Sequence, residues 1–104
     1  MPLPSYFIQY ADSSIEDLQE IKEHYREINN IFVSRFKAAL LAAQDEIIRN
    51  PFAFSKVNYK DFRRIIIKNF PYKITYRVEE NIIRVFCITH FSRSSRFMKK
   101  RLRK

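Results

Sequence analysis

The order of apolar and polar residues changes its period once along this chain, near residue 62. Before that point, apolar residues recur every three or four positions over residues 15–28 and again over residues 32–48, with polar and acidic residues between them. This is the period of a helix with one buried face. We therefore predict two helices that pack as an antiparallel hairpin.

Short signals mark the ends of these two helices. Ser13 is followed by Glu16 at the spacing of a capping box, which predicts the start of the first helix. The pair Asn29-Asn30 interrupts the apolar pattern and predicts the break between the helices. Pro51 disfavours helical geometry in the residue before it, so the second helix should end at Asn50.

The remaining segments have the composition of β-strands. Residues 3–10 are β-rich but begin with prolines, which suits a strand at the edge of a sheet. A β-branched run at residues 64–67, an alternating segment at 72–78 and a last strand at 82–88 are separated by two turns. We predict an α+β fold with an N-terminal strand, the helical hairpin, and a three-stranded antiparallel meander that completes one sheet.

The turn between the last two strands predicts their register. A two-residue turn at Glu80-Asn81 pairs opposite residues on the face below the helices. The expected pairs are Val78 with Ile83, Tyr76 with Val85, and Ile74 with Cys87. The other face then carries a basic, half-polar row made of Lys73, Thr75, Arg77, Arg84, Phe86, Ile88 and His90. We expect this second face to be open and to carry the function.

Length and hydrophobic content limit the chain to one domain. With 104 residues, of which 46% are hydrophobic, it can bury one core and no second. We treat residues 1–104 as a single domain in which about residues 94–104 form a loose basic tail or a short helix. No apolar run approaches the roughly 18 residues of a membrane span, and no signal peptide begins the chain, so we expect a soluble cytoplasmic protein.

Charge is divided unequally between the two halves of the sequence. Residues 1–50 contain five Lys/Arg and eight Asp/Glu, whereas residues 51–104 contain fifteen and three. Seven of these cations lie in the last twelve residues, where Phe97, Met98 and Leu102 recur at helical spacing. A polyanionic partner should bind to the second half of the chain. Both a nucleic acid and an acidic protein are polyanions of this kind.

Residue types also exclude several kinds of chemistry. The chain has no glycine, so phosphate would have to be bound by side chains rather than by a glycine-rich loop. Cys87 is the single cysteine, and His24 and His90 are the only other soft ligands. We expect no disulfide, no metal site and no cofactor.

Three short motifs occur in a characteristic order along the second half. They are Phe62-Arg63-Arg64 before the sheet, Phe70-Pro71-Tyr72 at a turn, and His90-x-x-Arg93 after the last strand. With them the chain resembles, over about residues 3–100, the ParE/RelE superfamily of toxins from bacterial type II toxin–antitoxin systems. The resemblance implies a cognate antitoxin that wraps around the toxin in a hetero-oligomer. ParE-like members inhibit DNA gyrase, and RelE-like members are ribosome-dependent endonucleases that cut mRNA.

The resemblance also bears on which of the two activities to expect. Cleavage of RNA without a metal needs an acid, a base and cations on the phosphate. His90, Lys73 and Arg64 would be the catalytic set if the chain were a nuclease. Phe91, however, stands where a His-type relative of RelE has a tyrosine, so a hydroxyl is missing. We expect a ParE-like gyrase inhibitor rather than an enzyme, with a RelE-like nuclease and a non-toxic nucleic-acid-binding adaptor as alternatives.

Contacts with the target or the antitoxin are expected from the cations and aromatic residues of the basic half. The expected contact residues are Arg63, Arg64, Arg77, Arg84, Phe86, Arg93, Arg96, Phe97, Lys99, Lys100 and Arg101. The competing interpretation of the last residues is that they only improve solubility or cap the edge of the sheet.

Overall fold

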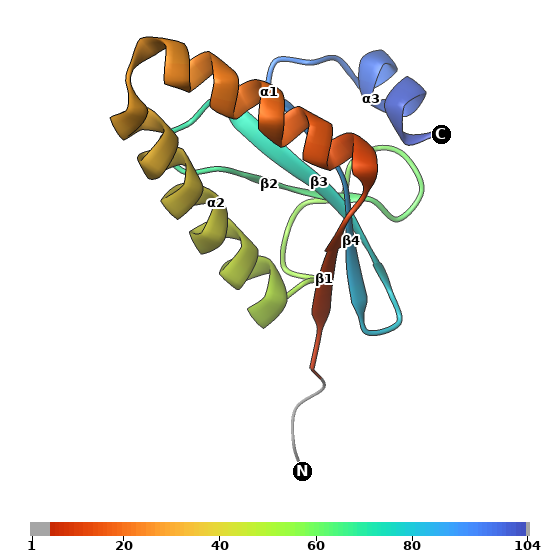
Figure 1. Cartoon of the computed structure of the whole chain (residues 1–104). Coiled ribbons are helices and arrows are strands. Elements are labelled where there is room, and N and C mark those ends of the chain that lie inside the picture. Colours follow the sequence, from red (N-terminus) through yellow and green to blue (C-terminus); the bar gives the residue numbers. More distant parts are fainter. Residues whose placement is uncertain (1–4, 104) are drawn as a thin grey trace.

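A computed structural model describes residues 5–103 of the chain. The elements are β1 (Phe7–Tyr10), α1 (Asp12–Ile28), α2 (Asn30–Arg49), β2 (Arg63–Ile66), β3 (Tyr72–Glu79), β4 (Ile82–His90) and α3 (Ser95–Leu102). In Figure 1, α1 and α2 form one layer over the sheet, and α3 lies near the end of β4. The predicted α+β fold is confirmed, although the first residues of the predicted strand 3–10 lie outside the described residues.

The four strands form one sheet in the order β1-β4-β3-β2. β3 is antiparallel to both β2 and β4, which confirms the predicted meander. β1 occupies an edge, as predicted, but it runs parallel to β4, with Phe7 opposite Ile82. A parallel neighbour requires a long crossover, and the helical hairpin is part of that connection.

Asn29 ends one helix and begins the next. Its backbone N–H donates to the carbonyl oxygen of Tyr25 at 2.9 Å, and its side-chain oxygen accepts from the N–H of Ile31 at 3.0 Å. An asparagine side chain can provide the acceptor that the first turn of a helix lacks. The predicted break between the helices is therefore confirmed. None of the helices in the described part of the chain is long and apolar enough to cross a membrane.

The main core lies between the helical hairpin and the sheet. Phe36 of α2 is fully buried at its centre, and its ring centroid lies 5.3 Å from that of Phe70 and 6.0 Å from those of Tyr25 and Tyr72. Tyr76 is also fully buried, and its hydroxyl donates to the carbonyl oxygen of Pro51 at 2.7 Å. Burial raises the pKa of Tyr76 to about 12, so this hydroxyl remains a hydrogen-bond donor at neutral pH.

β4 contains a bulge at Phe86. Tyr76 pairs with Val85 as predicted, but the next pair is Thr75 with Cys87, so Phe86 has no partner on β3. One extra residue reverses the orientation of every side chain that follows it, because side chains alternate between the two faces of a strand. The predicted register is therefore correct from Val78 to Tyr76 and wrong beyond that point.

The bulge changes the face on which three predicted side chains lie. Ile74 pairs with Ile88, not with Cys87, and Ile88 belongs to the main core rather than to the second face. His90 pairs with Tyr72 and lies on the helix side. Cys87 is buried, as predicted, but on the second face. There burial raises the pKa of its thiol to about 11, which leaves the thiol protonated and unreactive at neutral pH.

The second face of the sheet is covered rather than open. Met98 and Leu102 of α3 are each 5% exposed and pack with Phe62 and Cys87 in a small apolar cluster. The side chain of Ser94 accepts from the N–H of Phe97 at 3.2 Å and so caps the helix. Of the two expectations for these residues, a loose tail or a short helix, the structure has the helix, and it is packed rather than loose because its apolar positions recur on one side above an apolar surface.

Asp17 of α1 connects α1 to both β4 and α3. Its carboxylate accepts from the backbone N–H of Ile88 at 2.9 Å and from the guanidinium of Arg101 at 2.8 Å. One turn earlier, the hydroxyl of Ser13 donates to the carbonyl of Phe86 at 3.0 Å. Ser13 therefore does not form the predicted capping box: α1 begins at Asp12 without a side-chain cap. These contacts satisfy the edge of β4 beyond the last residue that β1 reaches.

Replacing Asp17 with alanine is expected to lower the free energy of unfolding by about 2–3 kcal/mol, because hydrogen bonds to a charged group are lost and half-buried donors remain without an acceptor. Asp17→Asn keeps an acceptor oxygen for Ile88 and should lose less. Urea unfolding at pH 7 measures both, with Glu16→Ala on the exposed side of α1 as the control. Equal stabilities for Asp17→Ala and Glu16→Ala would contradict the role assigned to this carboxylate.

Candidate functional site

A cationic pocket lies between α3, the strands β2 and β3, and the loop after α2. Its volume is about 330 Å³. Five cations line it, each from a different part of the chain: Lys56, Arg64, Lys73, Arg93 and Lys99. The remaining lining residues are Val57, Asn58, Tyr59, Phe91, Met98 and Leu102. None of the described residues that line this pocket is acidic, so its electrostatic potential is strongly positive.

The sheet and the neighbouring loop position these cations. Arg64 on β2 pairs with Thr75 and points to the second face, as does Lys73 on β3. The backbone N–H of Arg64 donates to the carbonyl of Ser55 at 3.0 Å, and an isolated bridge joins Lys56 to Arg63. The loop therefore runs along the outer edge of β2 and brings Lys56 to the pocket.

Lys73 is the most unusual member of the pocket. Its side chain is buried, with 5% of the residue exposed, and its ammonium donates to the carbonyl of Arg93 at 3.3 Å. Burial, and then the positive charge of Arg64, lower the pKa of Lys73. No ion pair joins Lys73 to a carboxylate within residues 5–103. A buried charge normally has such a partner, since removing it from water is costly.

Most of the predicted cations outside the pocket have structural partners. Arg77 and Arg84 lie 3.5 and 3.3 Å from the carboxylate of Glu79, and Arg101 is bound by Asp17. Arg63 donates to the carbonyl oxygens of Phe52 and Phe54 at 3.0 and 2.8 Å. These contacts hold the loop after α2 and the turn of the meander in place.

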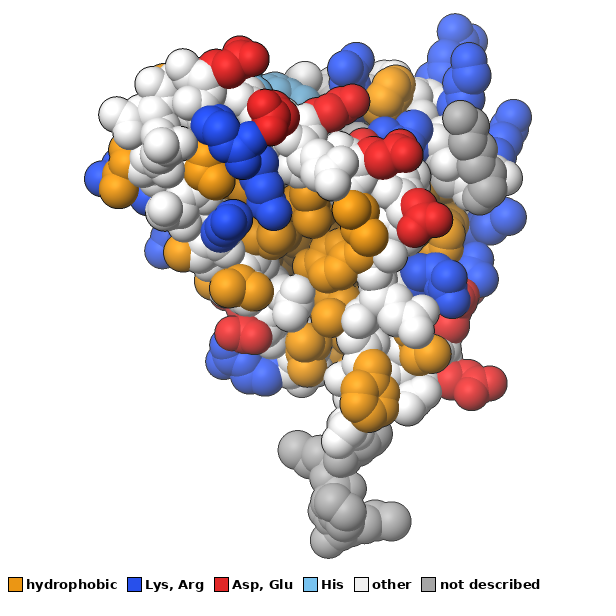
Figure 2. Space-filling model, viewed as in Figure 1, with side chains coloured by type: hydrophobic (Ala, Val, Ile, Leu, Met, Phe, Trp, Pro, Cys, Tyr) orange, Lys and Arg blue, Asp and Glu red, His pale blue; other side chains and the backbone are white. Residues whose placement is uncertain are grey.

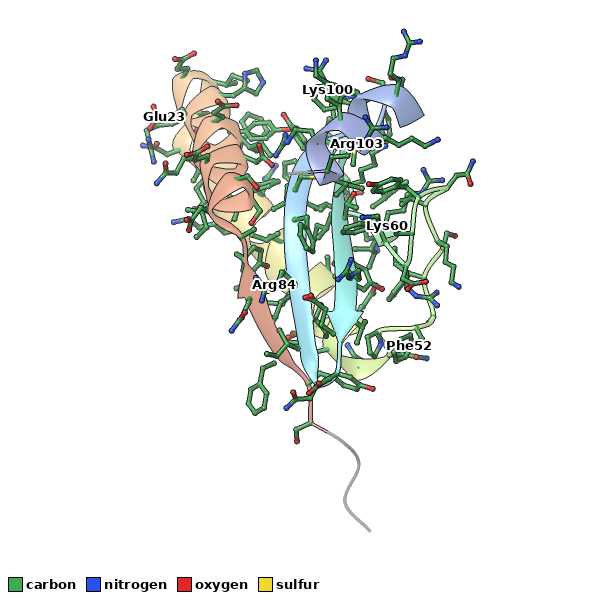
Figure 3. The ribbon with its side chains drawn as sticks, turned by 90° about the vertical axis from the view of Figure 1, so that its right-hand side faces the viewer. Glu23, Phe52, Lys60, Arg84, Lys100 and Arg103 are labelled. Atoms are coloured by element: carbon green, nitrogen blue, oxygen red, sulfur yellow. The ribbon has the colours of Figure 1, made fainter. Side chains whose placement is uncertain are left out.

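The aromatic residues and the rest of α3 form the surface around the pocket. Phe86 is half-buried, with its ring 4.9 Å from that of Phe62, so it is not the open stacking surface that the sequence predicted. The guanidinium of Arg93 lies 4.6 Å from the ring centre of Phe97. Arg96 and Lys100 are exposed. In Figure 3, Lys100 of α3, Arg103 just after it and Lys60 of the loop lie on one side of the sheet, and Glu23 of α1 lies on the other.

His90 is separated from the other two residues of the predicted catalytic set. It lies on the helix side of the sheet, in a different pocket of about 370 Å³ whose other lining residues include Asp17, Glu20 and His24. Its Nδ1 accepts from the N–H of Ser92 at 3.2 Å and lies 2.7 Å from the Ser92 hydroxyl. Lys73 and Arg64 are brought together on the opposite face, so the three residues do not converge on one point.

The architecture is a four-stranded sheet covered by a helical hairpin, and Lys and Arg side chains gather on the side of the molecule where α3 lies (Figure 2). The family described as "ParE toxin of type II toxin-antitoxin system, parDE" matches residues 8–94. The chain therefore belongs to the ParE toxin family, within the ParE/RelE superfamily, and the resemblance seen in its motifs is confirmed. No curated protein matches the sequence.

Three solved structures have a similar fold. A chain of the chromosomal ParDE system from P. aeruginosa is 15% identical, with a TM-score of 0.65 over 85% of this chain and 98% of that one. A chain of the toxin–antitoxin complex RelBE2 from Mycobacterium tuberculosis is 12% identical, with a TM-score of 0.55 over 83% and 98%. The isolated E. coli RelE toxin is 16% identical, with a TM-score of 0.55 over 95% and 98%. At these identities the similarity shows the fold alone.

Proposed function

We propose that this toxin acts as a ParE-like inhibitor of DNA gyrase and does not cleave RNA. The observation that carries the proposal is the separation of His90 from Lys73 and Arg64 by the thickness of the sheet. Metal-free cleavage of RNA needs a base, an acid and cations around a single phosphate. Phe91, beside His90, has no hydroxyl to replace the missing group. Membership of the ParE family supports the same target.

The proposal includes a cognate antitoxin that neutralises the toxin. Two of the similar structures are a ParDE system and a RelBE2 toxin–antitoxin complex. The basic half of this chain suits an acidic antitoxin segment, because exposed cations such as Arg96 and Lys100 attract carboxylates. Together with the pocket cations, these residues are the proposed contact surface for the antitoxin or the target.

The proposal is tested by expressing the intact chain in a bacterium with and without the protein encoded beside it. We expect expression of the chain alone to arrest growth and co-expression to restore it. Purified toxin should inhibit supercoiling by gyrase, while mRNA in a translation reaction should stay intact. His90→Ala should leave the inhibition of supercoiling unchanged.

Two results would contradict the proposal. Codon-positioned cuts in ribosome-bound mRNA that disappear in His90→Ala would identify a nuclease of the RelE type. Normal growth at a verified level of folded protein would show that the chain is not an active toxin.

A further inference from the structure

We propose that the outer face of α2 joins two copies of this chain in an antiparallel, two-fold symmetric dimer. The proposal does not depend on gyrase being the target. It rests on three observations about this face: its exposed apolar side chains, the hollow beside it, and the placement of two opposite charges along it.

The first observation is an apolar stripe on the side of α2 that faces away from the core. In Figure 1, α2 lies at the margin of the molecule. Ile31 and Leu41 of this helix are 47% and 55% exposed, and Ala38 and Ala42 are exposed as well. The four positions recur at helical spacing, so they form one stripe along the outer side. A row of exposed apolar side chains of this kind is typical of a surface that binds a protein.

The second observation is a hollow of about 800 Å³ beside this stripe. Ala38, Ala39 and Ala42 of α2 line it on one side, and Phe70 of the turn between β2 and β3 lines it on the other. The small alanine side chains leave room for a larger side chain from outside. Leu41 belongs to the same helix face but does not line the hollow. The face therefore carries both an exposed apolar side chain and a space that can receive one, as a self-complementary interface requires.

The third observation is the charge at the two ends of the stripe, which decides the orientation of the copies. Arg35 precedes Ala38 by three residues, and Asp45 follows Ala42 by three. Both charged residues are exposed, and neither forms an ion pair within residues 5–103. An antiparallel contact with a two-fold axis near position 40 places Arg35 of each copy opposite Asp45 of the other. A parallel contact would place like charges opposite one another.

The same axis brings the apolar positions into register. Ala38 of one copy lies opposite Ala42 of the other, and these small residues allow the two helix backbones to approach closely. Leu41 lies opposite Ala39 of the second copy, which lines the hollow. Because the interface is isologous, each copy inserts one leucine and receives one. Apolar contacts thus occupy the centre of the interface, and the two pairs of Arg35 with Asp45 lie at its rim.

The distribution of charge over the whole chain also favours contact on this side. α2 belongs to residues 1–50, which contain five Lys/Arg and eight Asp/Glu, whereas the excess of basic residues lies in residues 51–104. The cationic pocket and α3 are on the second face of the sheet, away from α2. Two copies can therefore meet through α2 while their basic surfaces stay apart and accessible. The remaining repulsion between them is screened over about 8 Å at physiological ionic strength.

The test measures the mass of the full native chain by sedimentation equilibrium over a range of concentrations. We expect a reversible dimer, with twice the mass of one chain, at physiological salt. Leu41→Glu places a charge in the apolar centre of the interface and should raise the dissociation constant roughly tenfold or more. Because Leu41 is exposed in the single chain, this variant should still fold, and circular dichroism checks this. Leu41→Ala gives a second, milder variant.

An exchange of charges tests the antiparallel arrangement. Arg35→Asp and Asp45→Arg each put like charges opposite one another, so each variant alone should associate more weakly than the native chain. An equimolar mixture of the two should form mixed dimers, because every charge at the rim then meets its opposite. The double variant Arg35→Asp/Asp45→Arg should associate as the native chain does.

The control for these variants is Glu16→Arg. It makes the same change of charge as Asp45→Arg, but at an exposed position of α1 outside the proposed interface. We expect it to associate as the native chain does. A loss of association equal to that of Asp45→Arg would mean that net charge, and not contact through α2, controls the mass.

Three further results would overturn the proposal. A native chain that stays a monomer at every concentration would show that this face does not pair with itself, and would leave it to an apolar segment of another protein. Undiminished association of Leu41→Glu would place the contact elsewhere on the chain. A mixture of Arg35→Asp and Asp45→Arg that associates no better than either variant alone would exclude the antiparallel contact.

Discussion

A chain that ends at Ser94 is expected to lose its stable fold. Truncation removes Met98 and Leu102, each 5% exposed, and uncovers Phe62 and Cys87, each 1% exposed. Loss of a buried Leu or Met side chain costs about 2–5 kcal/mol. Removing both therefore consumes much of the roughly 5–15 kcal/mol by which a domain of this kind is stable. Circular dichroism and urea unfolding of the truncated chain measure the loss.

A matched variant separates packing from charge in α3. It replaces Arg96, Lys99 and Lys100 of α3 and the following Arg103 with glutamine but keeps the apolar residues and Arg101, which is bound by Asp17. We expect this variant to unfold near the native midpoint while partner binding weakens and loses its salt dependence, since screening acts over about 8 Å at physiological ionic strength. A truncated chain with the native unfolding midpoint would show that α3 does not support the sheet.

Replacing Phe36 with alanine is expected to be the most damaging single change in the main core. The ring is fully buried and contacts Tyr25, Phe70 and Tyr72 from α1, the turn and β3. Burial of an aromatic ring in a close-packed core makes Phe→Ala cost about 3–5 kcal/mol. The expected result is a large drop in the urea midpoint with an unchanged dependence on denaturant.

Phe52→Ala is the control for this measurement, because Phe52 is 55% exposed. It should change the free energy of unfolding by less than about 0.5 kcal/mol, apart from a weak contact with Arg63. Phe36→Leu should fall between the two, since it leaves a smaller cavity. A Phe36→Ala variant as stable as Phe52→Ala would show that the ring cluster is not the centre of the core.

Local patterns predicted the elements and failed at contacts that are distant in sequence. The break at Asn29, the turn at Asn81 and the pairing of Val78 with Ile83 all follow from neighbouring residues. The bulge at Phe86 does not, because Val85, Phe86 and Cys87 suit either face of a strand equally well. The bulge is accompanied by two hydrogen bonds to α1, about 70 residues away in the sequence. The hydroxyl of Ser13 donates to the carbonyl of Phe86, and the carboxylate of Asp17 accepts from the N–H of Ile88.

The candidate site was only partly visible in the sequence for the same reason. The charge pattern identified Arg64, Lys73, Arg93 and Lys99, but it placed Lys73 on an open face, whereas α3 and the loop bury it. Lys56 and Tyr59 were missed, because their position depends on the bridge that aligns the loop with β2. No period or motif in residues 51–62 signals that alignment.

The parallel pairing of β1 with β4 has a consequence for the synthesis of the chain. Phe7–Tyr10 cannot pair in the sheet until Ile82–Val85 have been synthesised. Asp17 likewise has no partners until Ile88 and Arg101 have been synthesised. Translation proceeds at about 5–20 residues per second, so the two helices spend several seconds on the ribosome without the surface they cover. The sheet can therefore be completed only after β4 and α3 have been synthesised, and the covered surface of the helices remains exposed until then.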